Sequence, residues 1–368
     1  MKAPRIHAID IGRGIAMSFV FLAHAAWILS RSEGVYFITK QQLSLLYHLA
    51  TPSFLLISGA MLGYLYYSSS KDQFYKIKKK LRSRGILLIS VIHILIIIAK
   101  TIEESNYGEF YRAVLITDII GIVLLIYLFL IPRIKIRLYY ALILFIISWI
   151  IPYIWYPQNQ IILFIKHFLF GRGIDEGRVL LGPMVLIPLA AIYHCGVVVG
   201  KHLSIAVREE KISTFINRIF WWGLLSSSLS MIIIASKRLF FSAEMLNNPV
   251  FQTLFSLARR SPPSIFYPFW FGGISLILLA GLLWYEQRFI SFGYWGAVFK
   301  VFGRTSLFTF VCQAHVYTWF HKVAGIETPI SDLSWIIYYT ATFIILWVSS
   351  FLWLRYFMKL PSPFKEVK

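Results

Sequence analysis

Apolar runs of about twenty residues recur along the whole chain and are separated by short polar segments. A helix of roughly twenty apolar residues crosses the hydrocarbon core of a bilayer while satisfying its own backbone hydrogen bonds. The pattern therefore predicts an all-α fold, a polytopic transmembrane helix bundle of about ten spans. The predicted spans are residues 11–29, 45–67, 86–100, 114–131, 138–156, 180–200, 219–236, 265–284, 301–320 and 335–357.

The polar segments between these runs are too short to form a separate soluble domain. The run at residues 161–170 is apolar but too short to span, so we expect it to lie in the interface or to re-enter the membrane. The chain is 58% hydrophobic and 14% charged, whereas about a quarter of the residues of a soluble domain are charged. We therefore expect residues 1–368 to form a single integral-membrane domain.

The formal net charge of +20 at pH 7 could suggest a protein that binds nucleic acid. The Lys and Arg residues are instead concentrated in alternate loops, which is the positive-inside pattern of membrane proteins. We therefore expect a multi-pass plasma-membrane protein with both termini cytoplasmic, in contact with the lipid bilayer and not with nucleic acid. A basic cluster at residues 76–84 lies on the cytoplasmic side, where it either contacts anionic lipid or docks a polyanionic cytosolic ligand.

The first apolar run, Ile9 to Leu29, contains three ionisable residues, Asp10, Arg13 and His24, although charge inside hydrocarbon costs at least a few kcal/mol per residue. Arg13 and His24 are eleven positions apart, which is close to three helical turns, so their side chains point to nearly the same side. Asp10 precedes Arg13 by three positions and joins that side. One helix face is therefore expected to carry an Asp10–Arg13 ion pair near one membrane surface and an imidazole deeper in the bilayer.

The imidazole of His24 suits two roles in catalysis. A neutral histidine in an apolar site accepts a proton, as a general base does, and it can also carry an acyl group as a nucleophile. Arg13 stays protonated, and its forked donors suit a phosphate or a carboxylate. The alternative role of Arg13 is a structural ion pair with Asp10, and the two roles are compatible.

Other polar residues within the runs have structural and functional interpretations that the sequence leaves open. Asp118 either caps the fourth span or partners a buried histidine or arginine. His93 and His194 are expected to be satisfied bundle histidines, whereas His315 either packs or lines a substrate cavity. Cys195 and Cys312 lie inside predicted spans, and no disulfide framework or metal site is expected. The pairs Gly59/Gly63 and Gly196/Gly200 favour close helix packing, and an exposed face of this kind would allow a homodimer.

The segment Arg5-Ile-His-Ala-Ile-Asp10-Ile-Gly-Arg13-Gly14, followed by His24, resembles the opening of a multi-pass membrane acyltransferase superfamily. That superfamily includes the acyltransferase 3 family, the OpgC-like proteins and the heparan-alpha-glucosaminide N-acetyltransferase-like proteins. Further similar elements follow in order up to about residue 320. They are Pro52 to Ser58-Gly59, Gly182-Pro183 with Pro188, Gly196 and Gly200, Ser261-Pro262-Pro263-Ser264, and Gly303-Arg304-Thr305-Ser306-Leu307 with His315.

The resemblance implies transfer of an acyl group, often acetyl, from a cytosolic acyl-CoA to an extracytoplasmic sugar or glycan. Acyl-CoA would be a co-substrate and not a permanently bound cofactor. We expect His24, Asp10 and Arg13 to be catalytic, and Arg13, Arg82 and Arg84 to meet the phosphates of the donor. His315, Asp118 and Ser58 are the candidates for the substrate cavity.

Two other classes of function are compatible with the same polar residues. In a proton-coupled transporter or exporter, His24, His93, His315 and Asp118 would form a proton or substrate pathway. Transporters of this kind often consist of matched halves, and no such repeat is found in this chain. A structural protein that positions a synthesis complex is the third alternative, but it would leave the inward polar groups without a purpose.

Overall fold

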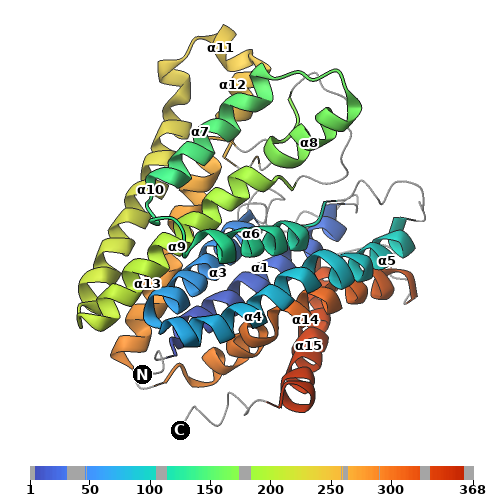
Figure 1. Cartoon of the computed structure of the whole chain (residues 1–368). Coiled ribbons are helices and arrows are strands. Elements are labelled where there is room, and N and C mark those ends of the chain that lie inside the picture. Colours follow the sequence, from blue (N-terminus) through green and yellow to red (C-terminus); the bar gives the residue numbers. More distant parts are fainter. Residues whose placement is uncertain are drawn as a thin grey trace. The chain divides into compact units, whose positions relative to one another are not determined.

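The computed structural model describes residues 5–30, 46, 48–104, 114–173, 184–257, 259, 264–289, 291–323 and 332–359. Every regular element in these residues is a helix, so the all-α fold is confirmed (Figure 1). Gly182, Pro183 and the segment 261–263, which contribute to the resemblance, lie outside the described residues. The helices are α1 (His7–Ser30), α3 (Ala50–Ser68), α4 (Lys71–Leu87), α5 (His93–Glu104), α6 (Ile116–Leu130), α7 (Tyr139–Ile154), α8 (Gln160–Phe170), α9 (Leu186–Arg208), α10 (Ile212–Phe240), α11 (Ala243–Asn247), α12 (Pro249–Leu254), α13 (Phe266–Arg288), α14 (Gly293–Val323) and α15 (Asp332–Leu352), with π-helices η1 (Leu88–Ile92) and η3 (Trp353–Phe357).

Six helical stretches in the described part of the chain are long and apolar enough to cross a membrane, which makes the protein a polytopic helical bundle. Helices α6, α7 and α8 are shorter and apolar, and α8 coincides with the run that was predicted to be too short to span. The six stretches are His7–Ala26, Lys71–Ala99, Leu186–Arg208, Ile212–Lys237, Phe266–Arg288 and Leu333–Phe357.

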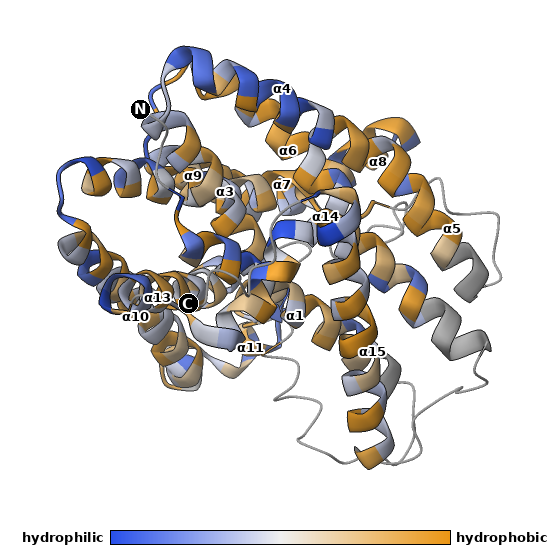
Figure 2. Cartoon of the chain, turned by 90° about the horizontal axis from the view of Figure 1, so that it is seen from below, coloured by the Kyte–Doolittle hydropathy of each residue, from blue (hydrophilic) through white to orange (hydrophobic). Residues whose placement is uncertain are grey.

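The third predicted span is only the apolar end of a longer helical run that begins at Lys71. Ser70 caps its start, because its hydroxyl accepts a hydrogen bond from the Gln73 N–H at 3.4 Å. The Lys and Arg side chains of α4 favour helix as well as water, so the helix continues outside the apolar run. Figure 2 shows the change from the hydrophilic residues of α4 to the hydrophobic residues of α5. The π-helix η1 lies between them and immediately precedes His93.

The chain divides into two compact units. The terminal unit is formed by Arg5–Phe54, Ile94–Tyr107 and Gly281–Lys368, and the central unit by Leu55–His93 and Gly108–Ala280. The core of the terminal unit is aromatic and comes from α1, α14 and α15, with Phe21 and Phe302 fully buried edge to face at 5.1 Å. Buried hydroxyls connect α14 to α15, because Thr309 bonds Thr305 at 3.0 Å and Ser350 at 2.8 Å.

In the central unit, α3 and α9 approach each other backbone to backbone. A Cβ on Gly59 or Gly63 would overlap the carbonyl oxygen of Tyr193 or Val197, and Gly196 and Gly200 face the carbonyls of Leu56 and Ala60 in the same way. The packing role predicted for both glycine pairs is confirmed. Because the pairs are buried against each other within one chain, they do not form the exposed face that a homodimer through them would need.

Candidate functional site

Two Gly-Arg elements from opposite ends of the sequence meet where α1 contacts α14 in the terminal unit. A Cβ on Gly14 would overlap the carbonyl oxygen of Phe299, and a Cβ on Gly303 would overlap that of Asp10. Only glycine permits this approach of the two backbones. The neighbouring residues Arg13 and Arg304 are therefore held beside the opposite helix.

Charged groups gather at the start of α1. The carboxylate of Glu286, at the end of α13, accepts hydrogen bonds from the backbone N–H groups of His7 and Ala8 at 2.7 and 2.8 Å. A carboxylate at this position stabilises the positive end of the helix dipole. Asp10 Oδ2 accepts hydrogen bonds from Arg5 at 2.9 and 2.7 Å and lies 4.0 Å from the Nε of Arg304, whose side chain is only 3% exposed.

Arg13 reaches α14 and not Asp10, so the expected Asp10–Arg13 ion pair is not formed. Its guanidinium donates a hydrogen bond to the hydroxyl of Ser306 and lies 5.8 Å from the ring centroid of Phe54. Asp10 is instead paired with Arg5 and Arg304. The physical reason is the close crossing of the two helices, which brings α14 within reach of both side chains.

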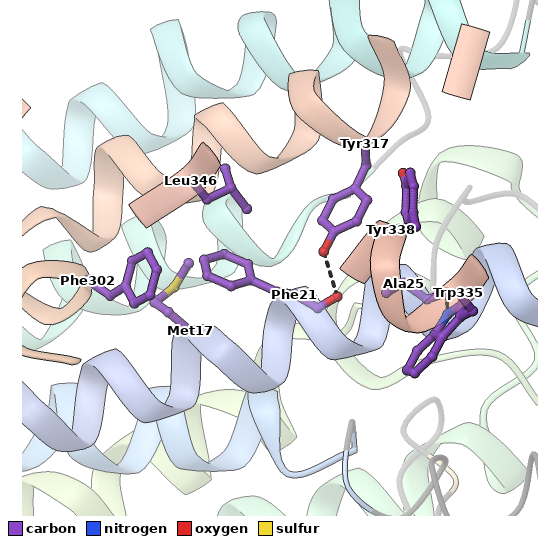
Figure 3. Packing of buried hydrophobic residues seen from close by; sticks show 8 residues of the cluster. All are labelled: Met17, Phe21, Ala25, Phe302, Tyr317, Trp335, Tyr338 and Leu346. Atoms are coloured by element: carbon purple, nitrogen blue, oxygen red, sulfur yellow. Dashed lines mark hydrogen bonds between the residues drawn. The ribbon is translucent and has the colours of Figure 1, made fainter. Parts of the chain in front are cut away.

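His24 lies three turns beyond Arg13 on α1, and its ring stacks on Tyr317 of α14 with centroids 5.8 Å apart and planes 19° apart. Figure 3 shows the neighbouring contacts: the Tyr317 hydroxyl donates to the Phe21 carbonyl at 3.0 Å, and Trp335 of α15 lies beside Ala25. The Trp335 indole N–H donates to the Ala25 carbonyl at 3.0 Å. Two aromatic donors thus fix the turn of α1 that carries His24.

His315 is on another side of α14. It is two positions before Tyr317, and a helix turns by about 200° over two residues. In agreement with this spacing, His315 lies close to the backbone of Leu95 in α5. The structure therefore does not bring His315 and the His24-facing side of α14 together.

Asp118 combines the two roles that the sequence left open. Its carboxylate accepts the backbone N–H of Leu115 at 2.8 Å, as a helix-capping group, and both of its oxygens lie 2.9 Å from His93 Nδ1. This partly buried pair joins α6 to the residue that follows the π-helix, in the central unit. Ser58 is also in the central unit, and its hydroxyl is buried without a hydrogen-bond partner among the described residues.

Arg82 and Arg84 are exposed on α4 in the central unit, whereas Arg13 belongs to the terminal unit. His194 is a satisfied bundle histidine as predicted: its Nδ1 accepts from the Tyr127 hydroxyl at 2.7 Å and its Nε2 donates to the Arg137 carbonyl at 2.9 Å. Cys195 and Cys312 are free.

The sequence interpretation missed Tyr317, Ser306 and Glu286 as neighbours of the α1 face. They are between about 280 and 293 positions from their partners, and a tyrosine, serine or glutamate near a span end carries no distinguishing local signal. The Gly303-Arg304 element was visible, but its pairing with Asp10 was not.

The helices and this polar crossing define a polytopic membrane protein with ionisable side chains inside its bundle. The profile of the family described as "Heparan-alpha-glucosaminide N-acetyltransferase, catalytic" matches residues 5–222, more than half of the chain. The chain belongs to this family, and the resemblance seen at Arg5–His24 is confirmed. The protein is an integral multi-pass membrane enzyme, an N-acetyltransferase, of a family that uses acetyl-CoA as donor. A search of the curated proteins finds no match.

Proposed function

We propose that the protein transfers the acetyl group of cytosolic acetyl-CoA to the amino group of an extracytoplasmic glucosaminide. The family supports an N-acetyltransferase, and the name of the family supports the choice of acceptor. We further propose that residues 1–368 act as one functional membrane domain in the plasma membrane. The single observation that carries the proposal is His24, held against Tyr317 on the same face of α1 as Arg13.

The proposed topology has ten spans with both termini cytoplasmic, and helix directions in the terminal unit support it. Helices α1 and α14 run in the same direction, because Gly303 faces Asp10 and Tyr317 faces Phe21. Helices α14 and α15 run in opposite directions, since Thr309 meets Ser350 and Tyr317 meets Tyr338. Spans one, nine and ten of an alternating topology have these relative directions.

Helix directions in the central unit support the same topology. Helices α3 and α9, the second and sixth spans, run in the same direction, because the Gly59 region faces Gly196 and the Gly63 region faces Gly200. The third and fourth spans run in opposite directions, because Gly85 contacts Leu125 while His93 contacts Asp118. The seventh and eighth do so as well, since Gly223 contacts Ile277 while Ser226 bonds Phe269.

In the proposed reaction, the acceptor nitrogen attacks the thioester carbonyl, a C–N bond forms and the C–S bond breaks. The proton that leaves the nitrogen passes to the imidazole of His24 and from there to the departing thiolate. His24 as an acyl carrier is the second form of the proposal, in which the imidazole first takes the acetyl group and then gives it to the acceptor.

Arg13 is proposed to meet a phosphate of the donor, and Asp10 to hold the charged end of the face in place through Arg304. Arg82 and Arg84, being exposed and basic, remain proposed contacts for the donor on the cytoplasmic side. His315, Asp118 and Ser58 remain proposed residues of the substrate cavity. The unsatisfied hydroxyl of Ser58 and the Asp118–His93 pair are polar groups that a sugar could contact.

Replacement of His24 by Ala tests the proposal. Loss of a general base lowers kcat by about 10²- to 10⁴-fold, and the exposed His202→Ala serves as the matched control with an unchanged rate. Transfer of radiolabelled acetyl from acetyl-CoA to glucosamine would be followed with purified, monodisperse protein. An unchanged rate in His24→Ala would refute the assignment.

A second measurement separates the base from the acyl carrier. Purified protein is mixed with acetyl-CoA in the absence of acceptor. An acyl carrier releases one equivalent of thiol and yields an acetylated peptide containing His24, whereas a general base releases thiol only after the acceptor is added.

A further inference from the structure

A basic cavity in the central unit is not used by the proposed reaction. It has a volume of about 420 Å³ and is lined by the end of α3, by the connection between α6 and α7, and by one turn of α9. Its charged lining residues are all cationic. The six lining residues with charged or phenolic side chains are Tyr66, Tyr67, Arg133, Lys135, Arg137 and Lys201.

The connection between α6 and α7, which carries three of these cations, is held in place by side chains of α9. Lys201 Nζ donates to the Ile136 carbonyl at 3.1 Å, and His194 Nε2 donates to the Arg137 carbonyl at 2.9 Å. Ile131 and Ile136 are 2% and 1% exposed, so the backbone on either side of the basic residues is anchored in the core. The side chains of Arg133, Lys135 and Arg137 are exposed on this fixed backbone.

This arrangement selects for one ligand chemistry. Four cations around one cavity exceed what a single carboxylate requires, and they repel metal ions. A phosphate group carries up to two charges and several acceptor oxygens, which forked Arg donors and Lys ammonium groups bind together. Tyr66 and Tyr67 add hydroxyl donors and ring faces at the same wall.

We propose that this cavity binds a phosphate-bearing ligand, either the phosphorylated nucleoside of a soluble compound or the headgroup of an anionic phospholipid. The inference does not rest on the proposed reaction, because it follows from the cations and the anchored connection alone. Under the proposed topology, α3, α6 and α9 all end on the cytoplasmic side, where both kinds of ligand occur.

The test compares two triple variants of the full chain in phosphatidylcholine nanodiscs. The pocket variant is Arg133→Gln/Lys135→Gln/Arg137→Gln. The matched control is Arg208→Gln/Lys211→Gln/Arg218→Gln, which removes the same charge from exposed positions of the same unit outside the cavity. Binding of adenosine 3′,5′-bisphosphate is measured by calorimetry, and retained phosphatidic acid by native mass spectrometry.

If the ligand is soluble, the pocket variant binds the bisphosphate about tenfold or more weakly while the control is nearly unchanged. If it is a lipid, only the pocket variant loses phosphatidic acid. Equal responses of the two variants to both probes, or no binding of either probe to the unaltered protein, would overturn the proposal. Should the triple variant not be monodisperse, the single exposed change Lys135→Glu gives the same readout. His24→Ala is expected to leave the binding of the bisphosphate and of phosphatidic acid unchanged. Failure of the proposed cavity can therefore be distinguished from failure of the proposed reaction.

Discussion

In the terminal unit α1 meets α14 through Gly14 and Gly303, and in the central unit α3 meets α9 through two glycine pairs. Both crossings bring helices of the same direction into backbone contact. Beside the first lie Asp10, Arg13 and Arg304, whereas the contacts of the second are carbonyls of Leu56, Ala60, Tyr193 and Val197. The same packing device therefore serves a charged site in one unit and an apolar scaffold in the other.

The difference shows what close packing contributes to chemistry inside a membrane. Buried charge is tolerated only where a partner is within reach, and long side chains on ordinary helices do not guarantee such reach. At the α1–α14 crossing the glycines let the two helix backbones come into contact, so Arg304 approaches Asp10 and Arg13 reaches Ser306. Glycine marks a tight crossing, and the residue beside it decides whether that crossing is a site.

The largest expected effect on stability comes from Asp10→Asn. Loss of the carboxylate removes the negative charge that lies 4.0 Å from the buried Arg304 guanidinium, which costs about 3 kcal/mol. In the central unit, Glu209→Gln removes an exposed partner of Lys211 and should change stability by less than about 1 kcal/mol. Thermal unfolding in detergent measures both, and equal shifts would contradict a special role for charge at the first crossing.

Alanine at the glycines should destabilise both crossings, but only the change at the α1–α14 crossing should lower kcat. The added Cβ of Gly14→Ala or Gly200→Ala overlaps a carbonyl oxygen, so the helices must separate at a cost of about 1–3 kcal/mol. We expect kcat per folded molecule to fall in Gly14→Ala and to persist in Gly200→Ala. If both variants lost the same fraction of kcat, the division into site and scaffold would be wrong.

Arg13→Lys should weaken binding of the donor by about tenfold, because a point charge does not replace a forked donor. Arg208→Lys, at an exposed position of the central unit, is the control and should leave the dissociation constant unchanged. Equilibrium binding of acetyl-CoA to both proteins gives the answer. An unaltered affinity in Arg13→Lys would restrict this residue to a structural role.

The smallest expected effects come from replacing one buried tyrosine in each unit by phenylalanine. Tyr317→Phe removes one donor to the Phe21 carbonyl and should cost about 1 kcal/mol, with a lower kcat because His24 stacks on this ring. Tyr127→Phe leaves His194 Nδ1 without its donor and should cost about 1–3 kcal/mol, with kcat retained. A lower kcat in Tyr127→Phe alone would reverse the assignment of the two units.

Much of the fold was predictable because its signals are local. Each predicted apolar run coincides with a helix in the described residues, and the glycine pairs of α3 and α9 pack as expected. The start of the third helix at Lys71 was not predicted, since hydrophobicity marks the membrane and not the helix. The basic connection at Arg133, Lys135 and Arg137 was interpreted only as a topology signal, because its cavity also needs Lys201 and Tyr67 from other helices.

Composition and spacing were enough to predict a helical membrane protein and a face of α1 that carries Asp10, Arg13 and His24. These properties depend on the length of apolar runs and on the 3.6-residue period, which involve only residues that are close together in the sequence. The family was indicated by the resemblance of the segment Arg5–His24 and is confirmed by the family profile. The partners of that face came from the folded molecule alone: Arg304 beside Asp10, Ser306 beside Arg13 and Tyr317 beside His24. Nearly three hundred residues separate the members of each pair, and only the packing of α14 on α1 brings them together.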